Sequence, residues 1–427
     1  MTEPVLSEKP SRSIIPRNVL VLTLSRTVWS MSDTNVDNFI SLYMISMGAT
    51  IPLIGLINAL GNFGAMLLYP IGGYIADKSG RVRLVSLSTL LYVASFVIYL
   101  LAPSWQWAAV AMIYQCMVLF YTPAMNAVMA DSIPVGKRGK LYAFNFALPN
   151  IIKIVSPYLG GLFIARYDVI PAMRIGFGIS FLIGVFVATV RFTFLRETLI
   201  DIERVNWDPV NLFSESYQHA LTSLRWVWTN LRSYTILSML LAFLSSLILP
   251  FWLIYAIQAI NIQPYEWAVI LLWSGVAKAV LSFFIGGIVD VLGSRKCFLI
   301  GFLLAIPGMF SFSLAKGFWM TMALYTLIVF SSVFMWIASQ VYLADSTPRE
   351  IRGRVMAGLG SGTSIGVTGV GVASGFIIFL PKTLGSLAGG YIYDFNPVAP
   401  WIVQSIFLGL GLLFTYFTIR DPTKPYE

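Results

Sequence analysis

Charged side chains are scarce in this sequence. They make up 11% of its 427 residues, whereas hydrophobic residues make up 57%, and the mean hydropathy is +0.79. A soluble domain carries roughly a quarter charged residues, so this chain has too little polar surface to cover a globule in water. Most of it is therefore expected to lie in lipid.

Cysteine and histidine are also nearly absent. Cys116 and Cys297 lie in or beside apolar segments, so no disulfide framework is expected, and His219 alone offers no metal-binding cluster. No Gly-x-x-x-x-Gly-Lys-Ser/Thr loop occurs, which disfavours an ATP-driven pump. No nucleophile–base or metal constellation of a membrane enzyme is visible either. We therefore expect a protein that is not an enzyme and needs no cofactor.

Long apolar runs are what the sequence has instead. A membrane-spanning helix needs about 20 mostly apolar residues, and the chain contains enough such runs to predict an all-α membrane protein with twelve transmembrane helices. The predicted spans are 18–46, 51–76, 82–103, 105–129, 140–165, 172–194, 234–259, 265–289, 296–315, 318–343, 356–391 and 399–419.

One long polar stretch divides these spans into two sets of six. Residues 196–232 are expected to form a cytoplasmic linker with an amphipathic helix on the membrane surface. The flanking segments, 1–195 and 233–427, are then an N-terminal and a C-terminal six-helix bundle.

The distribution of Lys and Arg predicts the orientation. The formal net charge is +9, but the cations cluster between apolar runs, which suits membrane topology better than nucleic-acid binding. With both termini inside, the cytoplasmic side receives Lys9, Arg12, Arg17, Lys78, Arg81, Arg83, Lys137, Arg138, Lys140, Arg295, Lys296, Arg349, Arg352, Arg354, Arg420, Lys424 and the five arginines from Arg191 to Arg232. The outside keeps only Arg166, Arg174, Lys316 and Lys382. Short outer loops without an Asn-x-Ser/Thr site favour a prokaryotic cytoplasmic (inner) membrane.

Two motifs recur at nearly half the chain length, which indicates a duplication. The first is a Gly, an Asp four positions later, a Gly three positions after that, and then basic residues; its two copies contain Asp77 and Asp290, an offset of 290 − 77 = 213. The two copies of the second motif contain Asp131 and Asp345, an offset of 345 − 131 = 214. Because each half has an even number of spans, the halves are expected to be parallel repeats, giving two pseudo-symmetric bundles.

These motifs are expected to form a gate on the cytoplasmic side. Gly73 would let its helix approach a neighbour closely, and Gly80 would supply a turn with positive φ. Asp77 could accept hydrogen bonds from a helix N-terminus, and Arg81 could pair with Asp131, so that one bundle is latched against the other. The predicted gate consists of Gly73, Asp77, Gly80, Arg81, Arg83, Asp131, Arg138, Gly286, Asp290, Gly293, Arg295, Asp345 and Arg352.

At these residues the sequence resembles the major facilitator superfamily. Gly73 to Arg83 is similar to the family's signature loop, Gly286 to Lys296 to its weaker copy, and Ser156 to Gly161 to part of its antiporter motif, with Ser156 in place of the first Gly. The resemblance covers the whole chain and implies two six-helix bundles around a central cavity that opens alternately to either side.

The halves differ in the length of one segment. From Lys140 to Asp168 there are 28 positions, whereas from Arg354 to Asp394 there are 40. The additional length falls near the Gly-rich stretch 358–375, which is expected to be an unwound or kinked start of the eleventh helix.

Ionisable residues within spans are costly and indicate function. Arg26, Asp33 and Asp37 share one face of the first span, while Lys153 and Lys278 lie in the fifth and eighth. Asp33 or Asp37 is expected to couple transport to protons, with the lysines as counter-ions or anchors for an anion. Alternatively, the acids pair permanently with Arg26 or Lys153 and only fix helix packing. With the helices that the resemblance assigns to the cavity, the predicted substrate-contact residues are Arg26, Trp29, Tyr114, Gln115, Tyr121, Asn126, Lys153, Trp252, Tyr255, Lys278, Trp336 and Gln340.

The predicted function is alternating-access transport of a small solute by a monomer in the lipid bilayer. Proton-coupled efflux of amphipathic compounds is favoured by the acids of the first span and by the partial antiporter motif. Proton-coupled uptake of an anionic metabolite or sugar is the alternative favoured by Lys153 and Lys278. A transport-inactive receptor or scaffold is the third reading, and the sequence does not name the solute.

Overall fold

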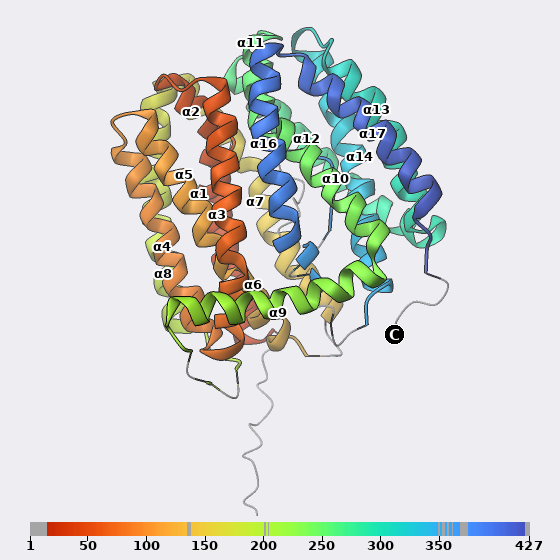
Figure 1. Ribbon diagram of the computed structural model, residues 1–427. Helices are drawn as coiled ribbons and strands as arrows, with labels where there is room; N and C mark the ends of the chain where they lie inside the picture. Colours follow the sequence, from red (N-terminus) through yellow and green to blue (C-terminus); the bar gives the residue numbers. More distant parts are fainter. Residues whose placement is uncertain are drawn as a thin grey trace, which may run out of the picture.

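The computed structural model consists of helices and irregular connections in the part of the chain that it describes (Figure 1). That part comprises residues 15–134, 138–199, 202–203, 205–348, 351, 355–356, 358–360, 362–367 and 375–422. The first half, as named below, contains α1 Arg17–Asp37, α2 Ile40–Ser46, α3 Ile51–Lys78, α4 Arg81–Leu101, α5 Trp105–Val118, η1 Leu119–Tyr121, α6 Thr122–Ser132, α7 Arg138–Tyr167 and α8 Val169–Phe194.

The linker contributes α9, Pro209–Asn230. The second half contains α10 Arg232–Ile248, η3 Leu249–Phe251, α11 Trp252–Gln258, α12 Pro264–Leu292, α13 Ser294–Phe312, α14 Gly317–Asp345, α16 Phe376–Phe395 and α17 Ala399–Thr418. The first, fourth and seventh predicted spans are each interrupted. The fourth and seventh pass through short 3₁₀ segments, with Pro123 and Pro250 at the breaks, because a proline lacks the N–H that an α-helix needs.

Among the described residues, ten helical segments are long and apolar enough to cross a membrane. The spans α1 and α16 are outside that set, although they have 21 and 20 residues. Their ionisable residues, among them Arg26 and Asp37 in α1 and Lys382 in α16, lower their hydropathy. A charged side chain at the centre of a span costs about 3 kcal/mol on insertion scales. With these two helices the described part of the chain has the twelve predicted spans, and both added helices carry charged side chains.

The eleventh predicted span, 356–391, is not a continuous helix over its first part. The continuous helix begins at Phe376, and residues 362–367 are irregular and buried against α10 and α14. Irregular backbone is tolerated at membrane depth only where protein groups satisfy it. Side chains do so here, because Ser245 Oγ, Ser332 Oγ and Trp252 Nε1 donate at 2.9 Å to the carbonyls of Ser364, Ile365 and Gly366, respectively. The predicted unwound start is thus present in the described part of 358–375, while 368–374 lie outside it.

The two halves meet along two seams. In the first, α3 runs beside α16 at the front of Figure 1, and a Cβ on Gly55 would lie only 2.8 Å from the Gly390 Cα. In the second, α7 packs against α12, where Gly161 abuts Ala268. Small residues allow such close helix contacts in lipid. We call these the α3–α16 seam and the α7–α12 seam.

The predicted linker helix is present as α9, which crosses one end of both halves (Figure 1). It is tied to α3, because Tyr74 donates its hydroxyl to Glu215 and the Lys78 ammonium lies 3.7 Å from the same carboxylate. Tyr217 donates to the Leu67 carbonyl at 3.1 Å, and its ring meets the ring of Phe376 in α16. The linker helix therefore contacts both halves, and we call this end of the molecule the linker side.

Candidate functional site

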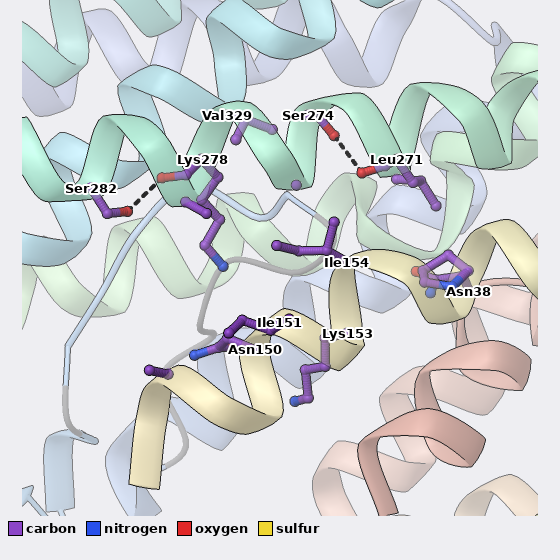
Figure 2. A pocket seen from close by; sticks show the side chains of 14 residues that line it. Asn38, Asn150, Ile151, Lys153, Ile154, Leu271, Ser274, Lys278, Ser282 and Val329 are labelled. Atoms are coloured by element: carbon purple, nitrogen blue, oxygen red, sulfur yellow. Dashed lines mark hydrogen bonds between the residues drawn. The ribbon is translucent and has the colours of Figure 1, made fainter. Parts of the chain in front are cut away.

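A pocket of about 330 Å³ lies at the α7–α12 seam (Figure 2). Most of its wall is apolar and comes from side chains such as Ile151, Ile154 and Leu271. Two lysines, Lys153 from α7 and Lys278 from α12, line the same pocket. The structure thus brings together two residues that the sequence predicted to be substrate contacts, one from each half.

The seam positions these two lysines. Near the pocket, Gly275 keeps α12 close to α7, where a Cβ would lie 3.2 Å from the Ile154 side chain. Lys278 points from α12 toward α7 and Asn150 (Figure 2). The two ammonium groups are near enough for the charge of Lys153 to act on Lys278. Because like charges repel in a poorly solvated site, an anion bound near these two lysines would relieve that repulsion. The arrangement suits a ligand with an acidic group and an apolar body.

The C-terminal end of α1 adjoins this pocket at its edge. Asn38, directly after α1, is one of the lining residues, and the preceding Asp37 is exposed. The side chain of Asp33 lies outside the described part of the chain. Arg26 is half-buried and lies in electrostatic range of Arg191, which is only 3% exposed and bonds Ser25 and Thr89. Arg191 is therefore buried inside the first half, not on a cytoplasmic surface as its charge predicted.

Two aromatic residues predicted to contact substrate belong instead to the core of the second half. Trp252 and Tyr255 are each 2% exposed, and both rings pack against Trp401. Their polar atoms are used internally, since Tyr255 donates to the Ser313 carbonyl at 2.8 Å and Trp252 to Gly366. The helix was predicted correctly, but its rotation turns these side chains away from the pocket.

Two predicted substrate-contact residues of the first half also lie away from this pocket. Trp29 packs against α4, with its ring centroid 5.1 Å from that of Tyr92. Gln115 is 7% exposed and accepts from the Tyr99 hydroxyl at 3.5 Å. Six further predicted residues are not on this pocket wall: Arg26, Tyr114, Tyr121, Asn126, Gln340 and Trp336, the last of which lies beside Gly362.

On the linker side, Arg81 and Asp131 form the predicted ion pair through Arg81 Nη1. Arg81 also lies 3.9 Å from Asp77, whose side chain is 75% exposed. The pair joins α4 to the end of α6, both in the first half. It therefore holds one bundle together and does not itself latch the two bundles, as the sequence had suggested.

The glycines of the repeated motif divide into two kinds. Gly80 has the predicted positive φ, 99°, and Gly293 in the second copy has a φ of 82°. Gly73 does not allow the predicted close approach, because a Cβ there would meet nothing within 4 Å. The close approach is made one residue earlier, where a Cβ on Gly72 would collide with the Phe120 carbonyl. Gly286 is likewise open.

Sequence reasoning missed a carboxylate in each half that completes these turns. Glu197, just after α8, accepts at 3.1 and 3.0 Å from the first two backbone N–H groups of α4, those of Arg81 and Val82. In the second half, Asp421 accepts from the Arg295 backbone N–H at 2.9 Å. Each carboxylate follows the last span of its half and caps the N-terminus of the third span, which is α4 in the first half and α13 in the second. The helix dipole favours a negative charge at that end. Partial burial acts to raise the pKa of Glu197, but four backbone N–H donors outweigh it and the pKa lies below its usual value.

The other predicted gate residues show no shared arrangement. Arg83 and Asp290 are exposed and Asp345 is half-buried. The side chain of Arg138 and all of Arg352 lie outside the described residues. Lys382, predicted on the outer side, lies in the middle of α16 and is 7% exposed.

Comparison with known proteins places the chain among membrane transporters. The family profile of the Major Facilitator Superfamily matches residues 22–243 and again 234–427. A "Na(+), Li(+), K(+)/H(+) antiporter" of Planococcus maritimus is 24% identical over 315 residues, which cover 67% of this chain and 72% of that protein.

Solved structures show the same fold. A bacterial homolog of the human lysosomal transporter Spinster, inward-facing and unoccupied, superimposes with a TM-score of 0.66 at 16% identity, covering 96% of this chain and 97% of that one. A D-xylose-proton symporter gives 0.67 at 16% identity, with coverage of 96% and 99%. The human organic anion transporter MFSD10 gives 0.63 at 16% identity, with coverage of 96% and 100%. At these identities the likeness concerns the fold alone.

Proposed function

Because the chain belongs to the Major Facilitator Superfamily, we propose that it is a secondary transporter that exports an amphipathic organic anion in exchange for protons. One observation carries the proposal: Lys153 and Lys278, from different halves, line one apolar pocket. The ammonium groups would hold the acidic group by charge-assisted hydrogen bonds, and the apolar wall would bury the rest of the ligand.

Exchange for protons is supported by three features. The similar protein from Planococcus maritimus is named as an antiporter, α7 carries part of the antiporter motif, and Asp37 is exposed beside the pocket residue Asn38. The direction is also energetically favourable. An anion moving out and a proton moving in carry charge in the same sense, so the membrane potential and the pH gradient drive the cycle together.

Binding to the pocket is tested with hexane-1-sulfonate, whose charge does not change with pH. Lys153→Gln or Lys278→Gln should weaken its binding to the purified protein by about tenfold or more, since a hydrogen bond to a charged group contributes about 1.5–3 kcal/mol. Titration calorimetry gives the dissociation constants. The matched control is Lys316→Gln, because Lys316 is an exposed lysine at the start of α14.

Unchanged binding in both pocket variants would refute the site. Counterflow of hexane-1-sulfonate in proteoliposomes tests transport separately, because a receptor or scaffold would bind the ligand without exchanging it.

Exchange of an inorganic cation for protons is a second candidate, favoured by the name of the Planococcus maritimus protein. In that case Asp37 would hold the cation or the proton, and the two pocket lysines would oppose a cation nearby. The two candidates predict different first results. Wild-type proteoliposomes should release protons when hexane-1-sulfonate is added under the first, and when NaCl is added under the second.

Asp37→Asn tests the coupling itself. An amide cannot take up a proton, so the variant should lose pH-driven uptake of hexane-1-sulfonate by about tenfold or more while keeping its counterflow, which needs no net proton movement. Asp33→Asn is measured in parallel because both acids were predicted to couple. Wild-type pH dependence in both variants would exclude the α1 acids as the coupling groups.

A further inference from the structure

Lys382 is a buried cation within a transmembrane helix. It is 7% exposed, and α16 shows lipid-facing side chains elsewhere: Leu380, Leu384, Tyr391 and Phe395 are 46–90% exposed. At 3.6 residues per turn, these four lie roughly opposite Lys382 on the helix. The same side as Lys382 carries Ser386, which faces Asn62 of α3 at 3.5 Å. Lys382 is therefore directed toward the interior of the protein.

The contacts described for Lys382 are with an aromatic ring and a thiol. Its ammonium lies 5.6 Å from the centre of the Phe379 ring, and the Cys116 thiol of α5 is near enough to interact electrostatically. Among the described residues, no carboxylate lies within ion-pair distance of Lys382. A buried charge without an opposite charge is destabilising, and intramembrane cations in transporters lie on substrate pathways.

The internal repeat relates Lys382 to the pocket lysine Lys153. Each lysine precedes a Gly-Gly pair by the same spacing: Lys153-x6-Gly160-Gly161 in α7 and Lys382-x6-Gly389-Gly390 in α16. The second glycine of each pair packs against the other half near a helix start, since Gly161 lies by the Pro264 carbonyl of α12 and Gly390 by the Pro52 carbonyl of α3. The two lysines thus occupy equivalent positions on the two seams.

We propose that Lys382 is a second anion-recognition residue of the transport path, and that the preferred substrate carries two acidic groups. This rests on the proposed function. One acidic group binds in the pocket of the α7–α12 seam, and the other meets Lys382 at the α3–α16 seam. The two places are distinct, because Lys382 is not among the residues that line the pocket.

The test compares hexane-1-sulfonate with hexane-1,6-disulfonate, which has the same carbon chain and a second acidic group. Wild-type protein should bind the disulfonate about tenfold more tightly. Lys382→Met should remove that advantage and leave monosulfonate binding unchanged, whereas Lys382→Arg should keep it. Without ligand, Lys382→Met should also melt at a higher temperature than wild type, because it removes an uncompensated charge while keeping the length of the side chain.

Three results would overturn the inference. They are equal binding of the two sulfonates by wild type, equal weakening of both by Lys382→Met, and a lower melting temperature of Lys382→Met without ligand. Lys278→Gln separates this inference from the proposed function. If Lys278→Gln and Lys153→Gln both bind hexane-1-sulfonate as wild type does, the pocket proposal fails, whereas the preference lost in Lys382→Met is measured independently.

Discussion

The α7–α12 seam and the α3–α16 seam are related by the repeat, yet they are packed differently. At the α7–α12 seam the helices touch at Gly161 and separate around a pocket nearer the linker side. At the α3–α16 seam the contact continues from Gly55 with Gly390 to the edge-to-face rings of Tyr69 and Phe379. One seam encloses space beside its lysines, and the other encloses its lysine completely.

The difference arises from what each glycine meets. Gly385 and Gly389 of α16 lie directly on carbonyl groups of α10, at Phe243 and Leu247, so α16 is fixed within its own half. Gly275 of α12 meets only the branched side chain of Ile154. Backbone contacts cannot adjust, whereas a side chain can change rotamer. We infer that the α3–α16 seam is the rigid one and that the α7–α12 seam yields to a ligand.

The largest expected effect comes from adding one methyl group to each seam. Gly55→Ala would place a Cβ 2.6 Å from the Ser386 carbonyl oxygen and should destabilise the protein by about 1–3 kcal/mol. Gly275→Ala would place it 3.2 Å from the Ile154 side chain and should cost less than about 1 kcal/mol. Thermal unfolding in detergent, followed by tryptophan fluorescence, gives the difference.

Both substitutions also gain the higher helix propensity of alanine, about 1 kcal/mol. Gly287→Ala measures that gain by itself, because Gly287 lies in α12 with nothing within 4 Å of a Cβ. If Gly55→Ala and Gly275→Ala shift the melting temperature equally relative to Gly287→Ala, the seams do not differ in rigidity and the comparison fails.

The sequence predicted a contact between two recognisable motifs better than contacts between segments that carry no motif. Arg81 and Asp131 could be paired because each ends a recognisable loop, and the interior charges Lys153 and Lys278 were recognisable because they interrupt apolar runs. The rotation of a helix about its axis is set by packing. The sequence alone therefore could not show that Trp252 faces the core of its half and not a cavity. The interior position of Lys382 was missed because charge counting alone assigned it to the outer side.

The carboxylate caps required tertiary structure for the same reason. Glu197 and Asp421 follow the last helices of their halves, far along the chain from the turns that they complete. Their spacing from those turns differs, since 197 − 80 = 117 and 421 − 293 = 128, so a search at one fixed offset does not relate them. Each carboxylate reaches its turn only because the last span of its half packs beside the third span of that half.

The smallest expected effect comes from removing the charge of these two caps, and here the two halves should behave alike. Glu197→Gln and Asp421→Asn should each destabilise the protein by about 1 kcal/mol or less, because each amide keeps an acceptor oxygen but loses the charge that favours a helix N-terminus. For Glu197 the loss should depend on pH. Its pKa is lowered in the folded protein, so its carboxylate stabilises the fold above the ordinary glutamate pKa, about 4.3, and this contribution disappears as the pH falls through the lower native value.

The difference in melting temperature between wild type and Glu197→Gln should therefore be constant from pH 8 to about pH 5 and shrink below about pH 4.3. Asp290→Asn is the matched control, because Asp290 is an exposed carboxylate of the same repeated motif. A cap acts through its charge at the helix N-terminus, so a shift in Asp290→Asn as large as in the two cap variants would mean that net charge alone, and not capping, stabilises this side. If only Glu197→Gln is destabilised, the halves differ at their turns as well as at their seams.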